Sequence, residues 1–396
     1  MTNSRLRRLT RGKALILVTV ALGVTAYAAS SSSASNNATS AKVDVAGAKA
    51  ALQKYSGIPK FNPMAPPFNA SKAKGKVIFD IPISSALPFI ASIDKGEQQA
   101  ATAAGAKLVI YPNQGTLSQW VQAFNEAIAE KVNLIILDAA PAPSQLQPQI
   151  KQAIAAGIPV IATHMPIASQ FPAGTLPSDN VGNVTGVVPG PFPLTSRLDA
   201  DYTIVHTPSH KPHALILTSN EVAASPGIVK MIQAEYQTRC GGQCPTTVVN
   251  VPLVDWATKI QGAIQSALLA DPTINWVIPI YDSMSEFVVP GIVGAHRSGK
   301  VQVVTFNGTP FVLQDIIKGS VAMDIGENEN WLGWAFMDQA LRIVSGHKPV
   351  KYTTAPTPVR VWDKSNVAQA GTPPGDSTGY GNNYKAGYLK LWGLAK

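Results

Sequence analysis

The sequence of 396 residues is poor in charged residues and in cysteine. Asp, Glu, Lys and Arg together make up 14% of the chain, whereas hydrophobic residues make up 45%. Disordered chains combine high charge with low hydrophobicity, so this composition indicates a globular protein. The chain is too long for one compact core, and its length suits two α/β domains with extensions.

Basic residues are concentrated near the N-terminus and sparse elsewhere. The formal charge of +9 falls to +4 without the five basic residues that precede the first apolar run, which are Arg5, Arg7, Arg8, Arg11 and Lys13. The rest of the chain has no dense cluster of Lys and Arg interleaved with aromatic residues. Nucleic-acid-binding proteins carry such clusters, so we expect no nucleic-acid partner.

An apolar run, Ala14–Ala29, follows this basic segment. Within it, Ala26-Tyr27-Ala28 has the A-x-A pattern of a signal-peptide cleavage site. A membrane-spanning helix needs about 20 apolar residues, so the shorter run indicates a signal peptide over residues 1–28 rather than an anchor. No cysteine lies near the cleavage site, which argues against a lipid anchor. We therefore expect an exported protein, periplasmic or otherwise extracytoplasmic.

The chain has two cysteines, Cys240 and Cys244, separated by three residues. A redox dithiol normally has two residues between its cysteines. A zinc site needs more ligands, and no other Cys or His is adjacent. In an exported chain this short spacing predicts a local structural disulfide.

Sequence motifs of the common enzyme classes are missing. The chain has no G-x-S-x-G, no G-x-x-x-x-G-K-S/T, no H-E-x-x-H and no Rossmann glycine motif after its first predicted strand. Of the six scattered histidines, His164 alone follows an apolar strand, where it could contact a ligand or be a hydrogen-bonded structural residue. Asp282 and Glu327 could form a carboxylate pair for glycoside cleavage, but their positions equally suit hydroxyl binding. We expect a protein that is not an enzyme and has no cofactor or metal.

Apolar strands alternate with amphipathic helices from Lys76 onwards, which predicts parallel sheets covered on both faces. Strands are expected over Val77–Ile81, Lys107–Tyr111, Leu134–Leu137, Ile158–Ala162, Ala214–Leu217, Thr247–Val251, Trp276–Ile280, Val301–Phe306 and Val321–Ile325. Helices are expected over Phe89–Ala104, Ser118–Glu130, Ser144–Ala156, Leu198–His206, Pro226–Tyr236, Thr258–Ala270, Ser285–Ala295, Phe311–Lys318 and Trp331–Val344. The passage Phe171–Pro193 breaks this alternation and is predicted to be loop.

In open parallel sheets, ligands bind outside the carboxyl ends of the strands. The loops after the predicted strands contain aromatics, amides and a few acids, which suit a neutral polar molecule. The candidate ligand-binding residues from these loops are Ser84, Ser85, Phe89, Asn113, His164, Asn220, Glu221, Trp256, Tyr281, Asp282, Asn307 and Glu327. Trp256 is the candidate for stacking on the ligand, although an indole is often a core residue.

Several short motifs, in order, resemble the type I periplasmic binding proteins, in the ribose- and galactose-binding branch related to LacI effector domains. In the first half these are Pro88-Phe89, Lys95-Gly96, Asn113-Gln114-Gly115, Leu134-Ile135-Ile136-Leu137 and Ala155-Ala156-Gly157-Ile158-Pro159-Val160-Ile161. In the second half they are Asp255-Trp256, Tyr281-Asp282, Phe306-Asn307-Gly308-Thr309-Pro310 and Ile316-Ile317-Lys318-Gly319. The resemblance covers about Lys76 to Val361, and its specificity comes from the order and spacing of the motifs.

The resemblance implies two doubly wound parallel-sheet domains joined by three hinge crossings. We expect these crossings near Leu176–Asn180, Ile325–Asn328 and Ala355–Val359. Domain one would comprise residues 76–177 and 328–356, and domain two residues 178–327 and 357–364. An N-terminal extension, 29–75, and a C-terminal extension, 365–396, would flank them.

The candidate site departs from the ribose-type pattern of this family. Apolar Leu87 and Ile90 stand where that pattern has an amide and an aromatic residue, and His164-Met165 replaces an Asp-Arg pair. The family pattern has a second arginine at a position near Gly227, and this chain has none there. Asn307 stands in place of an aspartate, and Glu327 in place of a glutamine. Ribose-type sites use charged groups because charge-assisted hydrogen bonds are strong and directional. Their loss argues against a simple pentose.

The resemblance implies an exported solute-binding protein of an ABC importer, a monomer that closes around a sugar-like, polyol or related hydroxylated molecule. Its partners would be this solute and the membrane subunits of an ABC permease. Two alternatives remain open at this stage. The chain could be an extracytoplasmic sensor that docks on a receptor, or it could bind a less polar, ring-containing, aromatic solute.

Overall fold

The computed structural model describes residues 42–139, 143–178 and 181–395. The predicted signal peptide, residues 1–28, lies outside these residues. Within them, no helix combines the length and the hydropathy that are needed to cross a bilayer.

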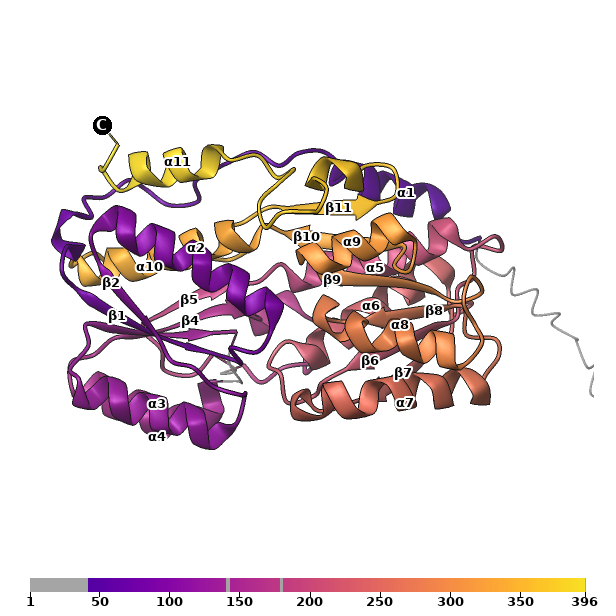
Figure 1. Cartoon of the computed structure of the whole chain (residues 1–396), viewed down its shortest axis with the longest axis horizontal. Coiled ribbons are helices and arrows are strands. Elements are labelled where there is room, and N and C mark those ends of the chain that lie inside the picture. The colour runs from indigo at the N-terminus through magenta and orange to yellow at the C-terminus, as the bar shows by residue number, and fades with distance from the viewer. Residues whose placement is uncertain (1–41, 140–142, 179–180, 396) are drawn as a thin grey trace, which may run out of the picture. The chain divides into compact units, whose positions relative to one another are not determined.

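A five-stranded parallel sheet forms the centre of what we call the first lobe. Its strand order is β2-β1-β3-β4-β5, and its strands are β1 Val77–Pro82, β2 Lys107–Ile110, β3 Leu134–Asp138, β4 Val160–Met165 and β5 Gly186–Pro189. Its helices are α2 Pro88–Ala104, α3 Leu117–Ala129, α4 Gln147–Ala155 and α10 Glu329–Val344. In Figure 1, α3 and α4 lie together on one side of this sheet, and α2 and α10 lie on the other side.

A six-stranded sheet forms the second lobe, in the order β11-β10-β9-β8-β6-β7. Its parallel strands are β6 Ala214–Thr218, β7 Thr246–Asn250, β8 Trp276–Pro279, β9 Gln302–Asn307 and β10 Met323–Glu327, and β11 Val359–Asp363 is antiparallel to β10. Its helices are α5 Phe192–His206, α6 Ser225–Cys240, α7 Trp256–Ala270, α8 Ser285–Gly294 and α9 Pro310–Lys318. The predicted class, two parallel-sheet α/β halves, is confirmed.

Helix α2 illustrates how the sequence sets these elements. Leu87 has extended backbone, as a residue before proline prefers, and Pro88 occupies the first turn, where its missing N–H costs nothing. Gly105 ends the helix in the left-handed conformation, with φ of 70°. A β-carbon on Gly96 would lie 2.3 Å from the carbonyl oxygen of Asn330 in α10, so the close packing of α2 on α10 requires glycine there.

One predicted crossing is wrong. Strand β5 pairs with β4 in the first sheet, so the first lobe continues to Pro189 and does not end at residue 177. The crossing therefore falls between Pro189 and Phe192, where α5 begins, rather than at Leu176–Asn180. Strand β10 ends at Glu327 and β11 begins at Val359, where the other two crossings were expected.

Each terminal extension contacts both lobes. Helix α1, Val45–Lys54, packs on α5 of the second lobe, and the carbonyl of Tyr55 accepts a hydrogen bond of 2.8 Å from the backbone of Val361 in β11. The chain then reaches the first lobe, where Phe68 is buried in its core. At the other end, Tyr380 belongs to the second core, whereas helix α11, Asn383–Leu391, packs on α10 of the first lobe.

Short 3₁₀ turns complete the described structure, and their bounds are Ser71–Ala73, Pro143–Leu146, Ala168–Gln170, Leu253–Asp255, Asp282–Met284 and Val367–Ala370.

Cys240 and Cys244 are joined by a disulfide at the end of α6, with 5.8 Å between their Cα atoms. Gly241 and Gly242 both have positive φ, which allows the tight turn between the two cysteines. The disulfide closes a very short loop, so the chain-entropy model predicts less stabilisation than the about 3 kcal/mol of a 15-residue loop. We expect reduction to lower the free energy of unfolding in urea by less than that amount. Two free thiols in denatured, unreduced exported protein would contradict the pairing.

Candidate functional site

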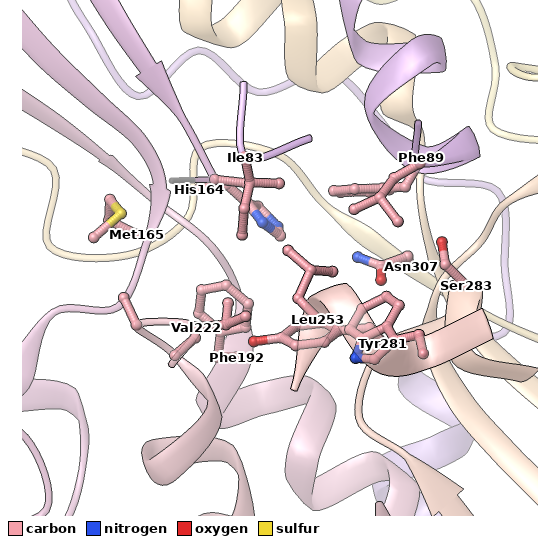
Figure 2. A pocket seen from close by; sticks show the side chains of 15 residues that line it. Ile83, Phe89, His164, Met165, Phe192, Val222, Leu253, Tyr281, Ser283 and Asn307 are labelled. Carbon is pink, nitrogen blue, oxygen red and sulfur yellow. The ribbon is translucent and has the colours of Figure 1, made fainter. Parts of the chain in front are cut away.

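A pocket lies where the carboxyl ends of strands from both sheets come together (Figure 2). The first lobe contributes the end of β4 and residues that follow β1 and β3, and Phe192 follows β5. The second lobe contributes the end of β9 and residues that follow β6, β7 and β8. The described residues that line it are Ile83, Leu87, Phe89, Ala139, His164, Met165, Phe192, Val222, Ala223, Ala224, Leu253, Trp256, Tyr281, Ser283 and Asn307. This is the location that the parallel-sheet rule predicts.

An irregularity at the end of β4 places His164 in the pocket. The pairing of β4 with β5 shifts register between Thr163 and Met165, and His164 between them has φ of 50°. Ala139, at the end of the neighbouring strand β3, also has a positive φ, 48°. Bulges and left-handed residues other than glycine are uncommon and cluster at functional sites, because they redirect a side chain out of the strand pattern.

His164 is bonded to a carboxylate of the second lobe. Its Nε2 lies 2.7 Å from Oε2 of Glu327, at the end of β10, and both side chains are almost completely buried. The other carboxylate oxygen of Glu327 accepts a hydrogen bond of 3.4 Å from the hydroxyl of Thr357. Glu327 does not line the pocket, so it acts on the pocket through the orientation of the His164 ring.

Aromatic rings surround His164. Its ring centroid lies 5.4 Å from that of Phe89 at the start of α2 and 4.8 Å from that of Phe192 at the start of α5. Phe306, the residue before Asn307 in β9, is stacked at 6.2 Å. The rings of Phe89, His164 and Phe192 lie around the same space in Figure 2.

Trp256 and Tyr281 form the aromatic wall of the second lobe. Their rings are stacked with centroids 6.3 Å apart. The indole Nε1 of Trp256 donates to Oγ of Ser219 at 2.6 Å and to the carbonyl of Val251 at 3.2 Å. The hydroxyls of Tyr281 and Ser225 are 3.1 Å apart. The polar atoms of this wall are therefore satisfied by the protein, and a ligand meets its ring faces.

Asn307 supplies a polar group that the protein leaves unpaired. Its side chain is only 2% exposed, and its amide Nδ2 has no hydrogen-bond partner. A buried donor without a partner costs about 1–3 kcal/mol, so a ligand acceptor at this position would gain that energy back. Among the described lining residues there is one histidine and no carboxylate, which does not suit a metal.

Five of the twelve residues predicted from the sequence line the pocket: Phe89, His164, Trp256, Tyr281 and Asn307. Glu327 joins them indirectly, through His164. The other six are not among its described lining residues, and the side chains of five of them bond neighbouring parts of the protein.

In the first lobe, three predicted polar residues are structural. Asn113 donates to the carbonyl of Pro82 at 2.8 Å and accepts from the backbone of Gly115 at 2.8 Å. Oγ of Ser85 accepts from the backbone of Asn113 at 3.2 Å, and Oγ of Ser84 accepts from that of Ala86 at 3.4 Å. These bonds hold the loops after β1 and β2 together.

In the second lobe, the side chains of Glu221 and Asp282 bond other parts of the protein, whereas that of Asn220 is exposed. The backbone N–H of Asn220 donates to Asn250, and its side chain is exposed. The carboxylate of Glu221 accepts from the backbone of Leu253, and Glu221 itself is not among the lining residues. Asp282 is fully buried, and its Oδ2 accepts from both the backbone and the hydroxyl of Thr309. Burial raises the pKa of Asp282 to about 6, against the opposing effect of the Thr309 bonds.

Most of the pocket residues that the prediction missed are apolar: Ile83, Ala139, Phe192, Val222, Ala223, Ala224 and Leu253. They lie in the same strand-end loops, but in sequence an apolar loop residue looks like a core residue. Phe192 had one detectable signal, since it opens the first helix of the second lobe after a Gly-Pro crossing. Leu87 and Met165, noted as departures from the ribose-type pattern, both line the pocket.

Residues 80–182 match the family described as periplasmic binding protein domain. The chain has the fold of the type I periplasmic binding proteins. This confirms the resemblance that the sequence motifs indicated. No curated protein sequence matches the chain.

Solved structures of this fold superpose over most of the chain. A 5-methylthioribose transporter solute binding protein from Thermotoga lettingae is 18% identical, with a TM-score of 0.65 over 84% of this chain and 99% of that one. A carbohydrate transporter protein from Acidothermus cellulolyticus, in complex with myo-inositol, is 20% identical, with a TM-score of 0.61 over 75% and 96%. A Caulobacter myo-inositol binding protein is 15% identical, with a TM-score of 0.63 over 78% and 99%. At these identities the similarity shows the fold.

Proposed function

We propose that this chain is an exported solute-binding protein of an ABC importer, which captures a small hydroxylated molecule by closure of its two lobes. The observation that carries the proposal is the pocket itself, because facing strand ends of both lobes supply its walls. A ligand held by both walls favours the closed arrangement through contacts that exist only there. The similar structure of a 5-methylthioribose transporter solute binding protein supports the same role.

The lining favours a solute that is less polar than a free sugar. Most of its described side chains are aliphatic or aromatic, and the polar atoms of Trp256 and Tyr281 are already paired. A hydroxyl buried against such walls has no partner and costs about 1–3 kcal/mol. The ligand of this site therefore carries a ring or alkyl part, with a few polar groups directed at Asn307 and His164. One of the similar structures is a solute binding protein in complex with 5-methylthioribose, a sugar with an apolar substituent, and this ligand belongs to the class proposed here.

Mass spectrometry of the ligand that co-purifies with the protein tests the proposal directly. Calorimetry against pentoses, hexoses, polyols, alkylthio sugars and aromatic glycols then ranks the classes, and we expect the substituted or aromatic members to bind best. Small-angle scattering should show a smaller radius of gyration with the best ligand. Tight, selective binding of free ribose would contradict the less polar ligand, and an unchanged scattering profile at saturation would contradict closure.

Trp256 provides a mutational test of the pocket. Trp256→Phe should weaken binding of the best ligand by about tenfold, since an aromatic contact contributes about 0.5–1.5 kcal/mol beyond its buried area and 1.4 kcal/mol is tenfold. The measurement is calorimetry on both variants. Trp276→Phe is the matched control, because Trp276 is also buried, and its Nε1 also donates to a hydroxyl, that of Thr207 at 2.7 Å. Equal losses in the two variants would mean that Trp256 acts only through stability.

A further inference from the structure

An acidic residue lies on the core-facing side of α2, where apolar residues are expected. This side carries Ile90, Ile93 and Ala100, all fully buried against the first sheet, and Glu97 among them is also fully buried. Asp80, in the middle of β1, is likewise fully buried. The interior of the first lobe therefore contains two carboxyl groups in positions that usually hold aliphatic side chains.

Most oxygens of the carboxyl groups in this region accept no hydrogen bond from the described residues. Both oxygens of Asp80, both oxygens of Glu97 and Oδ1 of Asp94 are buried without a hydrogen bond. No ion pair involving the three is found in the described part of the chain. One oxygen from each of Asp80, Asp94 and Glu97 lies within 4.8 Å of the others. Three carboxylate oxygens thus lie close together, two from fully buried residues and one from Asp94, which is half-buried.

A fourth carboxylate, from another strand, adds an independent observation. Pro82 of β1 is paired with Asp138 of β3, and side chains two residues apart on a strand share a face, so Asp80 and Asp138 lie on the same face of the sheet. Oδ1 of Asp138 accepts a hydrogen bond of 2.8 Å from Thr163, whereas its fully buried Oδ2 has no partner. That oxygen remains available to a group inside the protein.

An uncompensated group of buried carboxylates is costly. Burial and then the neighbouring Asp138 raise the pKa of Asp94 to about 7, and burial raises the pKa values of Asp80 and Glu97 as well. Buried charges in proteins are normally paired or coordinate metals. The carboxyl groups must therefore either retain protons or share a cation.

We propose that Asp80, Asp94 and Glu97 hold a divalent cation of the calcium class, with Asp138 as a further oxygen donor. Calcium prefers oxygen ligands at about 2.3–2.6 Å, so oxygens on opposite sides of the ion are up to about 5 Å apart, which accommodates the observed spacing. Zinc prefers Cys and His ligands, and this group contains neither. The cation would neutralise the interior beneath α2. Through Asp138 it would also support Ala139, which lines the pocket.

Equilibrium dialysis of the mature chain against ⁴⁵Ca²⁺, after removal of metals with a chelator, tests this site. We expect about one ion per chain, and competition by Mg²⁺ tests the preference for the larger ion. Asp80→Asn and Glu97→Gln should each weaken Ca²⁺ binding by at least about tenfold, since loss of even an outer-shell partner of a metal site costs 10–100-fold. Asp199→Asn is the matched control, because Asp199 is also buried with an unpaired oxygen but lies in α5 of the other lobe.

A measurement on the wild-type chain keeps the proposal testable if these variants do not fold. Added Ca²⁺ should raise the thermal unfolding midpoint, because an ion that binds only the folded chain stabilises it.

Two results would overturn the proposal. Absence of Ca²⁺ and Mg²⁺ binding to the metal-free wild-type chain, with no change in its unfolding midpoint, would mean that the carboxyl groups retain protons instead. Binding that is equally strong in the Asp80 and Glu97 variants would place the ion elsewhere.

Discussion

Replacing Trp392 with alanine is expected to lower the free energy of unfolding by about 3–5 kcal/mol, the range for removing a buried large aromatic side chain. Trp392 follows α11 and is fully buried. Its ring stacks on that of Trp334 in α10, with centroids 5.3 Å apart and 7° between the planes. Its Nε1 donates to Oδ1 of Asp338 at 2.7 Å, so the substitution removes both a large contact area and a buried hydrogen bond.

The effect is large because Trp392 is part of an aromatic cluster that attaches both terminal extensions to the first lobe. Trp331 of α10 stacks on Tyr384 of α11 with centroids 4.8 Å apart, and Phe61 of the N-terminal extension lies 5.9 Å from Trp331. The backbone of Phe68 donates to the carbonyl of Leu391, and that of Ala70 donates to the carbonyl of Trp392. Losing Trp392 therefore loosens two segments that are far apart in the sequence.

Urea denaturation followed by tryptophan fluorescence and circular dichroism measures this loss. Trp392→Phe should cost less than Trp392→Ala, because the phenyl ring retains part of the stacking on Trp334. Lys390→Ala is the control within α11, since Lys390 is exposed and its loss should change stability by no more than about 0.5 kcal/mol. An unfolding midpoint for Trp392→Ala equal to that of the control would show that this segment is not part of the cooperative unit.

The sequence predicted only the bounds of the C-terminal extension, residues 365–396. It could not predict the partner of Trp392, because aromatic residues in an irregular segment have no periodicity that specifies a contact. The contact depends on α10, which is itself positioned by a crossing from the second lobe. Such long-range contacts follow from the assembled fold rather than from local pattern.

The alternation of apolar strands and amphipathic helices was sufficient to predict the fold class and most elements. Strand β5 was missed because it is short, Gly186–Pro189, and follows a passage rich in Gly, Pro and Ser that predicts loop. Its omission moved the first predicted crossing to a position before the true one. Strand β11 was also not predicted, since it is a short antiparallel edge strand outside the βαβ rhythm.

The candidate site was predicted in its location more accurately than in its chemistry. The rule that ligands bind at carboxyl ends of parallel strands selected most of the loops that line the pocket. Within these loops, polar residues such as Asn113 and Asp282 were expected to face the ligand, but their side chains bond neighbouring backbone instead. Pro82 and Thr309, the partners of these side chains, are far from them in the sequence, so the sequence alone did not predict the bonds.

Replacing Glu327 with alanine is expected to cost about 3–5 kcal/mol, because it removes one member of a buried, bonded pair and leaves the other without its partner. The carboxylate bonds to His164 of the first lobe at 2.7 Å and to Thr357, next to β11, at 3.4 Å. Glu327 itself ends β10, directly before the second crossing. One fully buried side chain thus joins three segments that meet where the chain passes from one lobe to the other.

Glu327→Gln separates the hydrogen bonds from the charge. The amide side chain of this variant could still bond His164, so we expect it to lose clearly less stability than Glu327→Ala in urea denaturation. Lys259→Ala is a contrast at an exposed ion pair, since Lys259 bonds Asp255 at 2.8 Å and is 63% exposed. Its loss should cost no more than about 1 kcal/mol. Equal losses for Glu327→Ala and Lys259→Ala would contradict a stabilising role for the buried pair.

The same pair should also affect ligand binding, although Glu327 does not line the pocket. His164 lines it with a backbone conformation that is unfavourable for a residue other than glycine, and Glu327 fixes the direction of the ring. We therefore expect Glu327→Ala to weaken binding of the best ligand, as measured by calorimetry under conditions in which the variant is folded. Thr357→Val, which removes only the 3.4 Å bond, should bind as the wild type does. Wild-type affinity in a folded Glu327→Ala variant would mean that His164 keeps its orientation without the carboxylate, and that the pair acts on stability alone.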